Sequence, residues 1–221
     1  MIAYVESNFF LEIALGQEQA MFAKAILSLA EQDKIELAFP SFALSEPFTT
    51  LTYRRGRRSS LYRELEVTLK EIKRSEALRP IAQNMETLIV ALKQAQGDDF
   101  DPLHSVLARM LAAGRSIETD LSIFADALAY QASLGLLSQD SIIYAAVIND
   151  LKKRPASERK CFLSRDKSAF SEIVDFEAKK QRKAKFEAGE SINLELKQYN
   201  CQYMSNFENG LNFIQRFCSE K

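Results

Sequence analysis

Met1-Ile-Ala-Tyr-Val-Glu-Ser-Asn8, the first stretch of the chain, joins a short apolar run to an acid. Residues 2–5 are predicted to form a strand, because a strand of a parallel sheet that is buried on both faces is short and continuously apolar. Glu6 follows this run directly, at a position where a loop or helix cap more often supplies Ser, Gly or Asn. The stretch therefore predicts a buried strand that ends in a functional carboxylate.

Further short apolar runs are predicted as strands, and they alternate with stretches of helical periodicity. These predicted strands are residues 36–39, which Pro40 ends, and residues 116–119, 160–163 and 201–205. Alternation of short strands with helices favours a parallel sheet that is covered by helices on both faces. The sequence thus predicts an α/β fold.

Glycines and charge mark the helical stretches between these strands. The first helical stretch is expected to break near Gly16, and Gly135 is expected to end a helix over residues 121–133. Residues 56–115 carry a helical and highly charged pattern without a predicted strand. We therefore expect one domain over residues 1–221, with residues 56–115 as a helical insertion or elaboration.

Two serines are expected to begin helices that carry acids. Ser41 is expected to cap a helix that holds Glu46 in its second turn, and Ser138 is expected to cap the helix that holds Asp140. Each of these acids has an ordinary structural explanation when it is taken alone. An acid in the first turn of a helix is favoured by the helix dipole, and an exposed glutamate is common.

Taken together, the acids at the edges of hydrophobic segments predict a metal site. They are Glu6, Glu46, Asp140 and Asp166. The carboxyl ends of parallel strands share one edge of the sheet, so acids that are distant in sequence can meet there. Clustered carboxylates repel one another unless a cation neutralises them, and oxygen ligands without histidine favour Mg²⁺ or Mn²⁺. This pattern predicts metal-assisted chemistry on a phosphate-bearing substrate.

The composition of the chain argues against several other kinds of functional site. The single histidine, His104, nearly excludes His-dependent triads and histidine-rich zinc sites, and no glycine-rich phosphate loop is present. The three cysteines have no metal-ligand spacing, and Cys161 and Cys201 are expected as buried thiols. No signal peptide is visible and no apolar run approaches the roughly 20 residues that span a bilayer, so a cytoplasmic protein without membrane contact is expected.

Basic residues are concentrated in two short stretches although the net charge is −1. Arg54, Arg55, Arg57 and Arg58 form the first stretch, with Arg54 and Arg55 expected near a helix end, and residues 179–185 form the second. Such local patches can steer a polyanion, so the arginines are candidates for phosphate binding. Their alternative is a charged helix end or a solvated helix face.

The acidic motifs resemble the PIN-domain family in their order and spacing. The resemblance is carried by Val5-Glu-Ser-Asn8, by Ser41-Phe-Ala-Leu-Ser-Glu46, by Asp140-Ser-Ile-Ile-Tyr-Ala-Ala146 and by Ser164-Arg-Asp166. It covers roughly residues 1–54 and 116–217. It implies a three-layer α/β/α sandwich whose parallel sheet has the strand order 3-2-1-4-5.

The same resemblance implies a function and assigns roles to residues. Glu6, Glu46, Asp140 and Asp166 would form the acidic centre of a metal-dependent endoribonuclease that hydrolyses RNA, with the metal on Glu6, Asp140 and Asp166. A further set would orient these carboxylates: Ser7, Asn8 and Ser164. Many members are VapC-type toxins that a protein antitoxin silences, so such a partner, like a homodimer, is among the expected partners.

Two departures from the family pattern keep a second interpretation open. Glu6 stands where the family usually has Asp, and Ser168 stands where many members have a further Asp. The alternative function is therefore a catalytically weak or inactive PIN-like module that binds RNA or protein. A nuclease that acts on DNA is the third interpretation, since the same acids serve both substrates.

Overall fold

The computed structural model describes residues 1–94, 100–166, 170 and 190–218. The chain divides into two compact units. The first unit consists of Met1–Pro47 and Leu103–Lys221, and the second of Phe48–Pro102. Residues 56–102 of the expected helical insertion therefore belong to the second unit, whereas residues 103–115 belong to the first.

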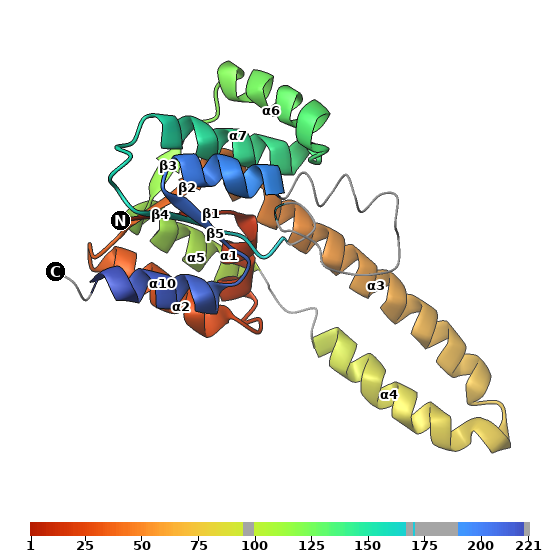
Figure 1. The fold of residues 1–221 in the computed structure, drawn as a ribbon. Coiled ribbons are helices and arrows are strands. Elements are labelled where there is room, and N and C mark those ends of the chain that lie inside the picture. Colours follow the sequence, from red (N-terminus) through yellow and green to blue (C-terminus); the bar gives the residue numbers. More distant parts are fainter. Residues whose placement is uncertain (95–99, 167–169, 171–189, 219–221) are drawn as a thin grey trace. The chain divides into compact units, whose positions relative to one another are not determined.

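A five-stranded parallel sheet in the order β3-β2-β1-β4-β5 forms the centre of the first unit (Figure 1). Its strands are β1 (Ile2–Val5), β2 (Glu36–Pro40), β3 (Arg115–Ile117), β4 (Lys160–Leu163) and β5 (Cys201–Met204). The central strand β1 pairs with β2 and β4, and all of its residues are fully buried. This sheet confirms the predicted α/β class and the parallel arrangement of the strands. The short apolar runs fit this arrangement, since strands of a parallel sheet are buried on both faces.

Helices cover both faces of this sheet (Figure 1). On one side lie α2 (Ala20–Glu31) and α10 (Phe207–Cys218), and on the other α6 (Leu121–Leu134) and α7 (Ser138–Lys152). This unit also contains α1 (Ser7–Ala14), η1 (Ser41–Leu44), most of α5 (Phe100–Ala113) and a helical stretch over residues 190–198. Edge-to-face aromatic pairs such as Phe9–Phe207 and Phe10–Phe39 fill the space between helices and sheet.

Two glycines end helices as the sequence predicted. Gly16 has a φ of +58° and Gly135 a φ of +65°, a left-handed conformation that glycine adopts at little cost. After Gly16, the amide of Gln17 donates to the carbonyl of Glu12 at 3.0 Å, and Gly16 itself donates to Ile13 at 3.3 Å. This pair of bonds is a Schellman motif, which closes α1 and turns the chain toward α2.

The expected beginnings of two helices were wrong. Ser41 is the first residue of the short 3₁₀ helix η1, and its hydroxyl contacts that of Thr119 at 3.1 Å. The long helix α3 (Glu46–Ile72) then begins at Glu46, which lies in its first turn and not its second. Pro47 explains this start, since proline is tolerated in the first turn, where its missing N–H group has no helical partner. Ser138 is likewise the first residue of α7 and not its cap.

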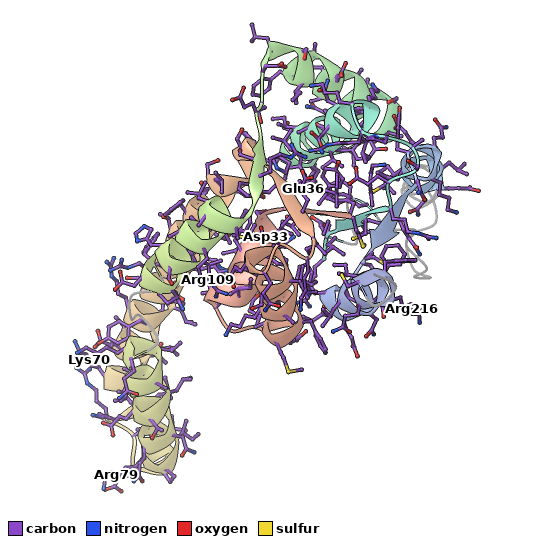
Figure 2. All side chains as sticks on the ribbon, turned by 90° about the vertical axis from the view of Figure 1, so that its left-hand side faces the viewer. Asp33, Glu36, Lys70, Arg79, Arg109 and Arg216 are labelled. Atoms are coloured by element: carbon purple, nitrogen blue, oxygen red, sulfur yellow. The ribbon has the colours of Figure 1, made fainter. Side chains whose placement is uncertain are left out.

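The second unit consists of helices. It contains α3 from Phe48 onward, η2 (Glu76–Leu78) and α4 (Arg79–Gln94), which runs back in the opposite direction to α3 (Figure 1). Lys73 and Glu86 form an ion pair close to the turn between α3 and α4. Lys70, before this turn, and Arg79, after it, are labelled in Figure 2. Arg54 and Arg55 therefore lie within α3 and not near its end, because the helix continues to Ile72.

An ion-pair network lies at the amino ends of the strands. Asp150 of α7 accepts hydrogen bonds from the Tyr4 hydroxyl at 2.7 Å and from both terminal nitrogens of Arg115 at 3.0 and 2.7 Å. Arg154 donates to Glu36 at 2.6 Å, and Glu36 also pairs with Arg115 (Figure 2 labels Glu36). Arg115 and Tyr4 hold the pKa of Asp150 below its usual range although burial opposes them. The network ties α7 to three strands.

Candidate functional site

Glu6 leaves the carboxyl end of the central strand and caps α1. Its Oε2 atom accepts hydrogen bonds from the backbone N–H of Asn8 at 2.8 Å and from the hydroxyl of Ser7 at 2.9 Å. Its Oε1 atom is buried and makes no hydrogen bond within the described part of the chain. Burial raises the pKa of Glu6 to about 7, although Asn8, Ser7 and Ser164 act in the opposite direction. One oxygen of Glu6 thus has a structural role, and the other lacks a partner.

Asp166 is presented by a turn that Ser164 holds in place. The buried Ser164 hydroxyl accepts a hydrogen bond from the backbone N–H of Asp166 at 3.0 Å. The Ser164 carbonyl accepts one from the hydroxyl of Tyr203 at 3.1 Å. Burial raises the pKa of Tyr203, and the charges of Asp166 and Glu6 raise it further, so both acids lie near this tyrosine.

Asp140 lies in the first turn of α7 and is half buried. Its pKa is raised to about 7, first by burial and then by the negative charges of Asp166 and Glu46. Glu46 begins α3, and its Oε2 atom is buried without a hydrogen bond inside the described residues. Glu46, Asp140 and Asp166, which come from distant parts of the sequence, therefore interact electrostatically.

We call Glu6, Glu46, Asp140 and Asp166 the acidic edge. All four belong to the first unit. Carboxylate oxygens suit a hard divalent cation. Such a cation could bind the buried oxygens that have no hydrogen-bond partner among the described residues, Oε1 of Glu6 and Oε2 of Glu46. Among the described residues, however, no three His, Cys, Asp or Glu side chains stand in an arrangement that could hold a metal ion. The fold brings Asp140 into electrostatic contact with Asp166 and Glu46, and it places Asp166 and Glu6 near Tyr203, without forming a ligand set among the described residues.

Of the two basic stretches, only the first lies within the described residues. Arg54, Arg55 and Arg57 are exposed on α3 and Arg58 is half buried, all in the second unit. Their predicted role in phosphate binding beside the acids stays a prediction. The stretch over residues 179–185 lies outside the described residues, as does Ser168, where many PIN domains have a further acid.

Two side chains beside the acidic edge were not anticipated. Tyr203 lies in β5, opposite Phe162 of β4, and gave no motif signal. Arg165 lies between Ser164 and Asp166, and it donates to Glu12 of α1 at 2.5 Å. The sequence shows that Arg165 lies inside the last acidic motif, which could have marked it as a candidate. Its partner Glu12 lies 153 positions earlier in the chain and could be identified only from the fold.

No protein-family model, curated protein or solved structure matches this chain. Within the described residues, no single helix has the length and apolar content needed to cross a membrane. Helices α6 and α7 have that length and apolar content only when they are taken together, and they are sharply bent relative to each other. The expected buried thiols are confirmed, since Cys161 and Cys201 are both buried.

Proposed function

We propose that the chain is a PIN-like, metal-dependent endoribonuclease whose centre is the acidic edge. The main support is the buried Oε1 atom of Glu6, which makes no hydrogen bond to the described residues, since an ionised oxygen of this kind is costly unless a cation or a donor compensates it. Further support comes from the order of the parallel strands, which agrees with the order that the family resemblance implies.

In this proposal, Glu6, Asp140 and Asp166 hold Mg²⁺ or Mn²⁺, and Glu46 assists them. The bound cation would supply an acidified water molecule and positive charge at the scissile phosphate. Ser7 and Asn8 fix one oxygen of Glu6, which leaves the other to the ion. Ser164 fixes the turn that carries Asp166. These hydrogen bonds would hold Glu6 and the turn of Asp166 in place, and ion binding would draw the acids together, since no three of them stand in a ligand arrangement among the described residues.

The acids would also couple metal binding to protons. With pKa values of about 7, Glu6 and Asp140 are each about half protonated at neutral pH. A cation favours the ionised carboxylates, so both residues would release protons when it binds. Cleavage of RNA is therefore expected to rise from pH 6 to pH 8 at a fixed low metal concentration.

An RNA-cleavage assay tests this function. The wild type is incubated with a mixed single-stranded RNA oligonucleotide and Mn²⁺, beside Asp140→Asn and the control Asp126→Asn, which alters a carboxylate of α6 outside the acidic edge. Cleavage by the wild type and by Asp126→Asn, with a loss of at least a hundredfold in Asp140→Asn, is expected. Equal, metal-independent cleavage by all three proteins would refute the proposal.

The second candidate is a PIN-like module that binds RNA or protein without cutting. It is favoured by the absence of a three-residue ligand set among the described side chains and by glutamate at position 6. RNA binding that survives chelation of metal, with no cleavage at any Mn²⁺ concentration, would select this module. A DNA oligonucleotide in the same assay tests the third interpretation, and an antitoxin-like partner and a homodimer stay predictions from the resemblance.

A further inference from the structure

A polar pocket of about 380 Å³ lies beside the acidic edge. It is lined by Asn8, Glu12, Gln17, Arg165 and Asp166, all of which belong to the first unit. The volume falls in the range of roughly 300–1,000 Å³ that is usual for small-ligand sites. Asn8, whose backbone N–H donates to Glu6, and Asp166 connect this pocket to the acidic edge. A substrate held at the acids would therefore have part of its structure in the pocket.

The wall of the pocket is built by interactions distant in sequence. Glu12 is buried, and its Oε1 atom accepts a hydrogen bond from the backbone N–H of Gln19. The side chain of Gln19 in turn accepts one from the backbone N–H of Phe207 at 2.6 Å. The Schellman motif at Gly16 fixes the loop between these residues. The pocket is thus held by α1, α10 and the turn after β4.

Arg165 carries the positive charge of the pocket, and its two terminal nitrogens have unequal partners. Nη1 donates at 2.5 Å to Glu12, whose side chain is 2% exposed. Nη2 donates at 3.1 Å to Glu18, whose side chain is 84% exposed. A buried partner anchors the guanidinium, whereas an exposed ion pair contributes little and is easily exchanged for another anion. Nη2 is therefore the donor that a ligand can take.

We propose that this pocket is the subsite for the nucleotide next to the cleaved phosphodiester bond. Arg165 binds the phosphate of that nucleotide through Nη2, in place of Glu18. The inference rests on the proposed function, because it takes RNA as the substrate of the acidic edge. A charged N–H donor held in a fixed orientation suits a phosphate oxygen, because a hydrogen bond between charged groups is stronger than one between neutral groups.

Binding of a labelled six-nucleotide single-stranded RNA, measured by fluorescence anisotropy in EDTA, tests the subsite without cleavage. The variants are Arg165→Gln, Arg165→Lys and Glu18→Gln. Arg109→Gln is the matched control, because Arg109 of α5 forms a similar surface pair with Glu31 at 2.7 and 2.9 Å (Figure 2). Thermal unfolding of each variant verifies that it is folded.

The subsite predicts that Arg165→Gln weakens binding about tenfold, as loss of a charged hydrogen bond does, and that Arg109→Gln binds like the wild type. Arg165→Lys should retain part of the affinity, and Glu18→Gln should tighten binding a fewfold, because a competing anion is gone. The salt dependence of Arg165→Gln should fall by about 0.7 in slope, the value of one single-strand phosphate contact.

Equal binding by Arg165→Gln and Arg109→Gln, or no RNA binding by the wild type, would overturn the subsite. The two proposals fail separately in this design. Mn²⁺-dependent cleavage by a protein whose Arg165→Gln variant binds RNA normally would leave the nuclease standing without the subsite. Weakened binding by Arg165→Gln in a protein that never cleaves would leave the subsite standing without the nuclease.

Discussion

Val5 of β1 pairs with Leu163 of β4 at the carboxyl end of the sheet. The next residues along the two strands, Glu6 and Ser164, therefore leave the sheet side by side. Glu6 then caps α1, and Ser164 holds the turn that carries Asp166. A single strand pairing thus places two acidic motifs, separated by more than 150 positions in the sequence, at the same edge of the fold.

The pKa of Glu6 predicts how stability changes with pH. Its folded pKa of about 7 lies above the unfolded value of 4.5, so the folded state binds more protons between these values. The free energy of unfolding should therefore fall as the pH rises from about 4.5 to 7, and stay lowered above that. Glu6→Gln should remove this cost and gain about 1–3 kcal/mol at pH 7.5, measured by urea denaturation. A wild type and a Glu6→Gln variant with parallel pH profiles would show that Glu6 ionises normally.

The network around Asp150 predicts a loss of stability. Asp150→Asn leaves Arg115, Arg154 and Tyr4 without the carboxylate that they share, and because both arginines are partly exposed and keep Glu36, the loss should be about 1–3 kcal/mol. Glu31→Gln, which breaks the exposed pair with Arg109, should cost less than about 1 kcal/mol. Urea denaturation of both variants gives the comparison. Losses of similar size would show that the network is not a buried one.

Close packing predicts a further loss at Gly210 of α10. A Cβ atom there would lie 2.5 Å from Cδ2 of Leu163, so Gly210→Ala should destabilise the protein by about 1–3 kcal/mol. The double variant with Leu163→Val should recover part of that loss, because the shorter side chain makes room. Gly56→Ala is the control, since nothing lies within 4 Å of its Cβ position in α3, and it should be neutral or stabilising.

The sequence predicted the sheet better than the helices. Residues 2–5 and 160–163 matched β1 and β4 because each is a short, mostly apolar run that ends at a polar residue, and a buried parallel strand leaves that pattern. The start of α3 was missed because a serine after a proline can begin either a helix or a 3₁₀ turn. Its length was missed because the arginines at positions 54–58 were interpreted as a charged helix end, whereas the helix continues to Ile72.

The local part of the candidate site was also predictable. Ser7 and Asn8 contact Glu6 within two positions, and Ser164 contacts Asp166, so the spacing alone suggested them. The pocket was not predictable, because its central contact joins Glu12 to Arg165, which lie 153 positions apart in the sequence. Contacts of this kind cannot be recognised from the spacing of residues along the sequence, because they depend on which strands are neighbours in the sheet.

Mn²⁺ binding by the purified protein, measured by isothermal titration calorimetry at pH 7.5, tests the central claim most directly. The account predicts saturable binding that Asp140→Asn weakens at least tenfold and that Asp126→Asn leaves unchanged. Binding should release protons, so its heat should change between buffers of different ionisation enthalpy. No saturable binding, or equal binding by Asp140→Asn and the wild type, would contradict the claim that these acids form a metal site.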